Sequence, residues 1–441
     1  MKNTIRRRLV SGGAWAIAGK VLSSTTSLAL LALLTRLLTV KEMSAYFLLF
    51  SVVAVSAICA QLGLDQTVVR IVARAMSQGM PGRARTAVYT VLRCGALGAF
   101  VMGGILFGGL GRWIAQSFFH SPVMTGVIIF ASPWVVVAAL QNLIAETFRS
   151  FHDIRLASIF TRSTSNVICV LGLGLIWILR QKATLPDVIL VSILAGTATV
   201  LISGFVLKRK LQSFPDSDPL NNKELLTAAF PQLITNLALL LNTQVALWTL
   251  GALAPPEQTA IYGAASRLVV VVTMPMVIVN SVVSPMIAEM YVQKRYSELE
   301  VTLRTVATLA GIPAFIVLGG YFALGKYVLA FVYGSYYAQG AAVLALLSVG
   351  QLVNVCSGCC GLTLIMSGHH RTMMKITVLC GLLNAVAAIL LTIIYGVIGA
   401  AAATAGTTIL ENILMTLSAR NKAGVWTHAR FSLILRQVQA R

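Results

Sequence analysis

Residues 376–395, ITVLCGLLNAVAAILLTIIY, contain no charged side chain, and the next run, residues 397–418, VIGAAAATAGTTILENILMTLS, contains one, Glu411. A transmembrane helix needs about 20 mostly apolar residues to cross the hydrocarbon core of a bilayer. Each run is therefore long enough to span a membrane. Similar runs recur along the whole chain, and together they predict an all-α, polytopic membrane protein.

The composition of the chain supports the same prediction. Of its 441 residues, 57% are hydrophobic and 11% are charged, whereas soluble domains carry roughly 25% charged residues. The formal net charge of +21 does not indicate nucleic-acid binding, because the basic residues lie in short loops between apolar runs and not on one soluble face. We therefore expect no nucleic acid among the partners.

Counting the apolar runs predicts about twelve transmembrane helices. The expected spans are residues 11–35, 44–63, 87–110, 123–145, 157–179, 187–207, 225–252, 260–286, 305–324, 339–366, 376–395 and 397–418. An even number of spans places both termini on one side, where 24 of the Lys and Arg residues then lie, against 6 on the other side. By the positive-inside rule, we expect both termini in the cytoplasm.

Three landmarks recur at one offset and predict an internal repeat: Tyr46 and Tyr262 (262 − 46 = 216), Thr86 and Thr302 (302 − 86 = 216), and Arg155 and Arg371 (371 − 155 = 216). Each half holds six expected spans, so both halves insert with the same orientation. The polar stretch from Lys208 to Glu224 joins them. We expect six-helix lobes in residues 1–210 and 225–418, a cytoplasmic linker in residues 211–224, and a basic tail in residues 419–441.

No catalytic or cofactor-binding motif stands out. The chain has no phosphate-binding loop of the G-x-x-x-x-G-K-[ST] type, so a gradient or a partner must drive any transport. The C-x-x-C-C cluster of Cys356, Cys359 and Cys360 lies in an expected span beside small residues, which favours helix packing over a metal site. We predict no catalytic residue, no metal ligand and no cofactor.

Cations inside the expected spans are the most informative residues. A Lys or Arg at the centre of a span costs roughly 2.5–3.5 kcal/mol, so such residues usually face a wet cavity. Lys20 shares a helix face with two serines, Arg93 shares one with two threonines, and Arg267 lies near the outer end of the eighth span. These cations indicate a surface suited to anions, although snorkelling of their long side chains to the interface is the alternative.

Two acids are candidates for ion coupling. Glu411 is placed well inside a span, and Asp65 lies at the cytoplasmic end of one, so either could titrate during coupling to an H⁺ or Na⁺ gradient. Glu411 could instead pair with a neighbouring cation as a packing device. A polar stripe on the seventh span contains Gln232, Asn236 and Thr243.

Several short motifs, spread over nearly the whole chain, resemble those of the polysaccharide flippases (the Wzx type) of the multidrug, oligosaccharidyl-lipid and polysaccharide exporter superfamily. They are GGAW at 12–15, LTRLL at 34–38, AY at 45–46, LGL at 62–64 with VR at 69–70, ETFR at 146–149 and IYGAASRL at 261–268. Residues 43–46, MSAY, depart from the pattern, because such proteins often have a glycine just before the aromatic residue.

The resemblance implies two six-helix lobes around a cationic central cavity in a bacterial inner (cytoplasmic) membrane. Its implied substrate is an undecaprenyl-diphosphate-linked oligosaccharide. On electrostatic grounds we predict that Lys20, Arg93 and Arg267 line one central cavity and bind the diphosphate of this carrier, with Arg36 at the outer mouth. This carrier would be turned from the cytoplasmic to the periplasmic leaflet for O-antigen (lipopolysaccharide), capsule or exopolysaccharide synthesis. Its expected partners are the lipid-linked glycan, membrane lipids, a polysaccharide polymerase and a chain-length regulator.

Three other functions remain open. A multidrug exporter of the same superfamily would be expected to embed carboxylates for cationic drugs, and this chain embeds mainly cations. A peptidoglycan-precursor flippase would have an extra pair of helices. A membrane glycosyltransferase or polymerase would present catalytic residues on a large external loop, whereas all the expected external loops here are short.

Overall fold

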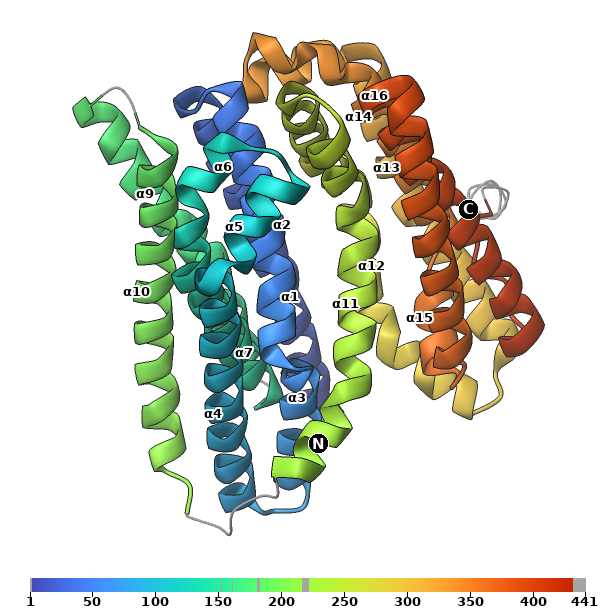
Figure 1. The fold of residues 1–441 in the computed structure, drawn as a ribbon. Coiled ribbons are helices and arrows are strands. Elements are labelled where there is room, and N and C mark those ends of the chain that lie inside the picture. The colour runs from blue at the N-terminus through green and yellow to red at the C-terminus, as the bar shows by residue number, and fades with distance from the viewer. Residues whose placement is uncertain (1, 152, 161, 181–182, 216–221, 431–441) are drawn as a thin grey trace. The chain divides into compact units, whose positions relative to one another are not determined.

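The computed structural model describes residues 2–151, 153–160, 162–180, 183–215 and 222–430. Within these residues the chain is helical and contains no strand, so the expected all-α, polytopic membrane fold is confirmed (Figure 1). The chain packs as two units, residues 1–241 and residues 242–441.

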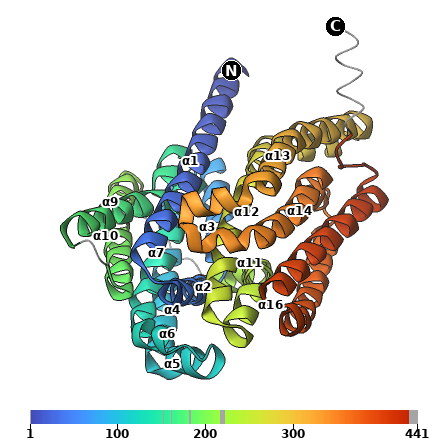
Figure 2. The ribbon, with the colours of Figure 1, turned by 90° about the horizontal axis from the view of Figure 1, so that it is seen from above.

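Unit 1, residues 1–241, is built around α7. In this unit α7 packs against α2, α4 and α10, and α9 packs against α1 and α10 (Figure 2). The elements are α1 (Lys2–Leu37), α2 (Val40–Gln61), α3 (Leu64–Ser77), α4 (Pro81–Ile105), η1 (Leu106–Leu110), α5 (Gly111–Trp113), η2 (Ile114–Phe118), α6 (Pro122–Val127), η3 (Ile128–Phe130), α7 (Ala131–Ser150), α8 (Ile154–Ile159), α9 (Arg162–Arg180), α10 (Leu185–Gln212) and the first part of α11 (Asn222–Leu253).

Unit 2, residues 242–441, is built around α14. This helix packs against α12, α13 and α16, and α15 packs against α16 and α12. The elements are the rest of α11, α12 (Pro256–Val292), α13 (Tyr296–Tyr333), η4 (Ser335–Gly340), α14 (Ala341–Ser357), α15 (Cys360–Met366) and α16 (His370–Ala423).

Side-chain caps fix where several helices begin. Thr39 and Glu42 form a capping box at the start of α2, and Thr184 and Asp187 form another at the start of α10. Asp153 accepts a hydrogen bond from the backbone N–H of Leu156 and starts α8. These caps satisfy N–H groups that have no partner inside the helix.

Left-handed or unusual backbone interrupts the helices at several places, three of which bear on the sites described below. Leu62 and Gly63 have φ of 53° and 75° and separate α2 from α3. Gly396 (φ 58°, ψ −137°) breaks α16 between the two predicted spans 376–395 and 397–418. Gly358 (φ 74°, ψ −152°) separates α14 from α15, so residues 339–366 do not form the single continuous helix that the apolar run predicts. A glycine tolerates this backbone, which ends regular helical hydrogen bonding.

Ten helices in the described part of the chain are long and apolar enough to cross a membrane. The sequence predicts about twelve spans, and the difference has two sources. The 54 residues of α16 hold two predicted spans on either side of Gly396. The first predicted span, residues 11–35, falls on α1 (Lys2–Leu37), in which the stretch whose side chains are all described, Val21–Leu37, is too short to be counted as a span.

The boundary between the two units lies later in the sequence than the predicted linker. The expected joint was residues 211–224, of which 216–221 lie outside the described residues, whereas the units divide between Leu241 and Asn242 within α11. The predicted lobe boundaries stay a prediction. Helix starts do recur at the predicted offset: Asp153 is the N-cap of α8 and His369 is the N-cap of α16 (369 − 153 = 216).

Candidate functional site

The predicted cations are distributed over both units. Arg36 lies exposed in the last turn of α1 and Arg93 lies exposed on α4, both in unit 1. Arg267 is half-buried on α12 in unit 2, where its charge acts on the hydroxyl of Tyr333. Lys20 belongs to α1, but its side chain lies outside the described residues. Their convergence on one cavity stays a prediction.

Asp65 lies directly after the break between α2 and α3. A Cβ atom on Gly63 would lie 2.2 Å from the carbonyl oxygen of Ala229 and 2.7 Å from the backbone nitrogen of Leu233, so only a glycine allows α11 to approach this closely. Asp65 occupies the first turn of α3, where the helix dipole favours a negative charge. The break therefore brings a carboxylate against the first part of α11.

The polar stripe predicted on the seventh span reaches Asp65. Asn236 Nδ2 donates a hydrogen bond of 2.9 Å to Asp65 Oδ2, and Gln232 Nε2 donates one of 2.9 Å to Asn236 Oδ1. Asp65 is only 7% exposed, and its Oδ1 atom has no hydrogen-bond partner. A buried acceptor without a partner is costly, which makes this oxygen a place where a proton or a small cation would be stabilised.

A second buried acid, Glu146, lies near Asp65, and the pattern of apolar runs does not indicate it as a buried charge. The predicted span ended at residue 145, whereas α7 continues to Ser150 and carries Glu146 inside it. Glu146 pairs with Arg149 at 2.9 Å and is within electrostatic range of Asp65. One turn earlier on α7, Asn142 Nδ2 donates a hydrogen bond of 2.8 Å to Gln61 Oε1. Amides and acids of α2, α3 and α7 thus gather around the break.

Glu411 on α16 is held by neutral partners. Thr377 Oγ1 donates to Glu411 Oε1 at 2.8 Å, and Asn242 Nδ2 lies 3.5 Å from Oε2. Asn384 Nδ2 in turn donates to Asn242 Oδ1 at 3.3 Å. No ion pair to Glu411 occurs among the described residues, so the alternative that it pairs with a cation as a packing device is not supported there.

One face of α16 organises the Glu411 cluster. Thr377, Gly381 and Asn384 are spaced at i, i+4 and i+7, which places them on the same side of the helix. Gly381 lies beside the side chain of Asn242. Asn384 is 1% exposed, and its Oδ1 atom has no hydrogen-bond partner. The cluster therefore offers a carboxylate, amide oxygens and a hydroxyl, an oxygen-rich set that suits a proton or a hard cation.

A separate cavity of about 200 Å³ opens within unit 2 beside the break between α14 and α15. Its polar lining comes from α12, α14 and α16, and its apolar lining comes from α12, α15 and α16. None of the described residues that line it is charged. The polar side chains are Thr273, Asn280, Asn354 and Asn412, and the apolar ones include Met276, Val277, Leu362 and Met415. Amides beside apolar walls suit a neutral, hydroxyl-bearing group.

Residues 9–291 match the model of a family described as "Polysaccharide biosynthesis protein". A comparison with curated proteins gives no match.

Several solved structures are similar to this chain in fold. An inward-facing multidrug resistance MATE family transporter of the MOP superfamily superposes with a TM-score of 0.76 at 14% identity, over 91% of this chain and 94% of that one. The lipid II flippase MurJ, in an inward closed conformation, has a TM-score of 0.73 at 12% identity, over 91% and 87% of the two chains. A MOP superfamily transporter from Pyrococcus furiosus has a TM-score of 0.64 at 14% identity, over 95% of each chain.

Proposed function

We propose that this chain, which belongs to the polysaccharide biosynthesis protein family, is a flippase. It would translocate undecaprenyl-diphosphate-linked oligosaccharide units from the cytoplasmic to the periplasmic leaflet. The family match over residues 9–291 is the observation that carries this proposal. The fold, shared with transporters and with a lipid II flippase, is compatible with it. The polysaccharide served would be an O-antigen, a capsule or an exopolysaccharide.

The cations support an anionic carrier as substrate. A cation inside a membrane is costly alone, but charge-assisted hydrogen bonds to a diphosphate offset this cost, and a guanidinium can make them in a bidentate manner. We assign this role to Lys20, Arg93 and Arg267, with Arg36 at the outer mouth. Several moderate contacts suit transport better than one tight site, because the carrier must also be released.

The cavity in unit 2 is suited to the glycan part of the same substrate. Its amide side chains, Asn280, Asn354 and Asn412, can donate to and accept from sugar hydroxyls, while its apolar wall fits the C–H face of a ring. Asn280 Oδ1 is buried without a hydrogen-bond partner, as expected for an acceptor that a ligand would satisfy. This chemistry favours a neutral sugar over a charged one at this position.

We further propose that translocation is coupled to an H⁺ or Na⁺ gradient through Glu411, with Asp65 as the second candidate. Among the described residues, amide or hydroxyl donors hold both carboxylates, and no Lys or Arg side chain pairs with either. Binding of a proton or Na⁺ would therefore neutralise a charge that these neighbours leave in place. The protein would reside in the bacterial inner membrane with both termini in the cytoplasm. Its protein partners would be a polysaccharide polymerase and a chain-length regulator.

Depletion of the protein in its native host tests the proposal. Mass spectrometry should then identify a lipid-linked glycan that accumulates on the cytoplasmic leaflet, and re-expression of the wild-type protein should clear it. Glu411→Gln should fail to clear it. Glu298→Gln is the matched control, because Glu298 is an exposed acid of the same unit that pairs with Arg295 at the start of α13.

The alternatives give different results in this experiment. Accumulation of peptidoglycan precursor would identify a peptidoglycan-precursor flippase, and unchanged glycans with increased sensitivity to cationic drugs would identify a multidrug exporter. Glycans that reach the outer leaflet but remain unpolymerised would indicate a glycosyltransferase or polymerase. Any of these outcomes would reject the proposed substrate.

A further inference from the structure

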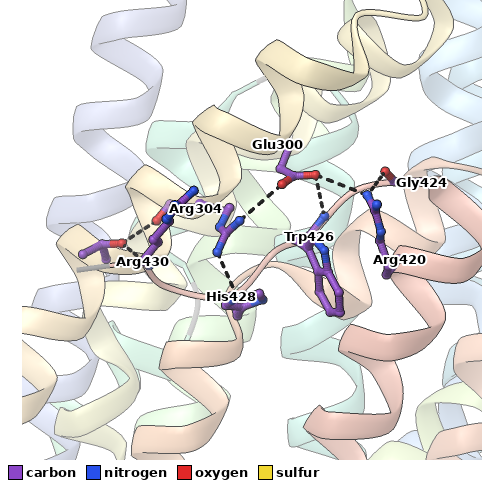
Figure 3. A network of polar contacts seen from close by, with 8 residues as sticks. Glu300, Arg304, Arg420, Gly424, Trp426, His428 and Arg430 are labelled. Carbon is purple, nitrogen blue, oxygen red and sulfur yellow. Dashed lines mark hydrogen bonds and ion pairs between the residues drawn. The ribbon is translucent and has the colours of Figure 1, made fainter. Parts of the chain in front are cut away.

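Beyond α16, the chain continues as a short segment that lies across unit 2. We name residues 424–430 the carboxyl-terminal strap. Gly424 (φ 76°) ends α16, and the strap then runs past Glu300 and Arg304 of α13 (Figure 3). It also contacts the break between α14 and α15. Its hydrogen bonds join Trp426 N to Glu300 Oε2 (3.2 Å), Thr427 Oγ1 to Ser357 O (2.8 Å), Ala429 N to Cys356 O (2.7 Å) and Arg430 N to Thr308 Oγ1 (2.9 Å).

The strap completes the break between α14 and α15. The carbonyl groups at the end of a helix have no partner inside the helix, and here the strap donates to two of them, those of Cys356 and Ser357. A Cβ atom on Gly358 would lie 2.3 Å from the carbonyl oxygen of Thr427, so the break and the strap are fitted to each other. Val425 and Thr427 are fully buried.

A charged network holds the strap in place. Glu300 lies between Arg304 Nη1 at 3.3 Å and Arg420 Nη1 at 3.6 Å, and it also accepts from Trp426 (Figure 3). The guanidinium of Arg420 lies 5.6 Å from the centre of the Trp426 ring and donates to the carbonyl of Gly424. Thus α13 and α16 both hold the strap through Glu300.

The contact between Arg304 and His428 depends on the protonation state of the imidazole. Arg304 Nη2 lies 3.0 Å from His428 Nε2. A guanidinium has donors only, so Nε2 must be the acceptor and the ring must be neutral in this contact. A protonated ring would turn an N–H toward the guanidinium and place two positive charges side by side.

We propose that the strap is a pH-sensitive latch, closed while His428 is neutral and released when it is protonated. The charged groups that face His428 are Arg304 and Glu300 on α13, Arg420 on α16 and Arg430 in the strap itself. Glu300 is already shared by Arg304 and Arg420, so it has little capacity to compensate a further positive charge.

Release of the strap would change the wall of the cavity in unit 2. Gly358, Cys359 and Cys360 belong to the cavity wall and also follow the two carbonyl groups that the strap satisfies. Without the strap these carbonyls lose their donors and the break loses its support. Acidification on the side of the strap would therefore loosen one wall of the cavity. This inference concerns unit 2 alone and does not depend on the substrate proposed above.

Hydrogen–deuterium exchange of the purified full-length protein in detergent, followed on peptides that cover residues 424–430, tests the latch. The backbone N–H groups of Trp426, Ala429 and Arg430 donate its hydrogen bonds, so their protection reports the closed strap. After correction for the intrinsic pH dependence of exchange, we expect the wild-type strap to lose protection at least about tenfold between about pH 7.5 and about pH 5.

Two substitutions of His428 separate charge from packing. His428→Gln keeps an acceptor for Arg304 that does not titrate, so the strap should stay protected at both pH values. His428→Lys places a permanent charge there, so protection should be absent at both. His369→Gln is the matched control, since His369 contacts Ser367 and should leave the pH response as in the wild type.

Peptides from α12, which belongs to the same unit as the strap, report whether each variant is folded, and His428→Gln remains informative if His428→Lys does not fold. Equal protection of the wild-type strap at both pH values would overturn the proposal. So would a protected strap in folded His428→Lys at about pH 7.5. A pH response retained by His428→Gln would assign the switch to another group and would equally reject the role of His428.

Discussion

Thr377 Oγ1 and Glu411 Oε1 are joined by a hydrogen bond of 2.8 Å between two turns of α16 that lie on opposite sides of its break at Gly396. The bond orients a carboxylate inside a membrane-length helix without neutralising it. Since Asn242 and Asn384 add only neutral groups, the charge remains available to a mobile ion.

Substitution of Glu411 or Thr377 should change ion-driven transport in a graded way. Glu411→Gln should abolish export, because no carboxylate remains to exchange an ion. Thr377→Val removes a hydrogen bond to a charged group, worth about 1.5–3 kcal/mol, so the ion concentration for half-maximal transport should shift by about tenfold or more. Thr377→Ser should stay near the wild type. Transport in reconstituted vesicles measures this, and transport unchanged after both H⁺ and Na⁺ gradients are collapsed would refute coupling.

Arg93→Ala and Arg267→Ala should abolish glycan export while leaving membrane insertion intact. The corresponding Lys variants should retain part of it, because a point charge still attracts the diphosphate without the bidentate geometry. Accumulation of lipid-linked glycan measures the loss, and Arg112→Ala, an exposed cation of α5, serves as the matched control. If the Ala variants are made at normal levels and export normally, the two arginines only snorkel or pack.

The termini should both lie in the cytoplasm. Alkaline phosphatase, which is active only outside the cytoplasm, should give no activity when fused after Arg441, since the bias of 24 to 6 basic residues orients the chain. A fusion in the predicted external loop around Arg112 should be active. Clear activity of the fusion after Arg441 would reverse the orientation or change the number of spans by one.

Gly358→Ala should destabilise unit 2. The backbone of Gly358 (φ 74°, ψ −152°) is unfavourable for any residue with a Cβ atom, at a cost of about 1–3 kcal/mol, and the added atom would overlap the carbonyl of Thr427. Thermal unfolding in detergent should show a lower midpoint than the wild type. Gly368→Ala is a useful comparison, because its φ is also positive (85°) but nothing lies within 4 Å of the added atom. Equal midpoints for the two variants would mean that the close approach of the strap adds nothing.

Stability should fall in mild acid through His428. Burial, and then the neighbouring Arg304, lower the pKa of His428 below its usual value of about 6.5. A lowered pKa means that the unfolded chain takes up the proton first, so this contribution to stability is complete above about pH 6.5 and is lost as the pH falls through the folded-state pKa. The unfolding midpoint of the wild type should therefore drop with acidification more than that of His428→Gln. Parallel pH profiles would contradict this.

The membrane-spanning architecture could be predicted from the sequence because hydropathy is a local property. The runs 376–395 and 397–418 are separated by Gly396, and the break in α16 lies at that residue. The break at Gly358 could not be predicted in the same way. A glycine within an apolar run does not show whether its φ is positive, and the strap residue that completes this break, Thr427, is 70 residues from its partner Ser357.

The candidate ion sites were predictable only in part, for a related reason. Asp65 and Glu411 stand out as acids in apolar surroundings, but their amide partners lie 171 and 169 residues away along the chain. Glu146 was missed because an apolar run ends where hydropathy falls, whereas a helix ends where its hydrogen bonding ends, here at Ser150. Tertiary neighbours decide both which carboxylates are buried and which oxygen atoms lack a partner.

The position of α11 determines how this protein could be expressed as two fragments that reassemble. A gene cut within the linker would produce two polypeptides, and the second would begin with the helix that carries Ala229 and Asn236. Ala229 packs closely against Gly63 of the first polypeptide, and Asn236 donates a hydrogen bond to its Asp65. The second polypeptide would therefore carry the surface that binds the first. Co-expressed fragments should associate through this surface and complement each other.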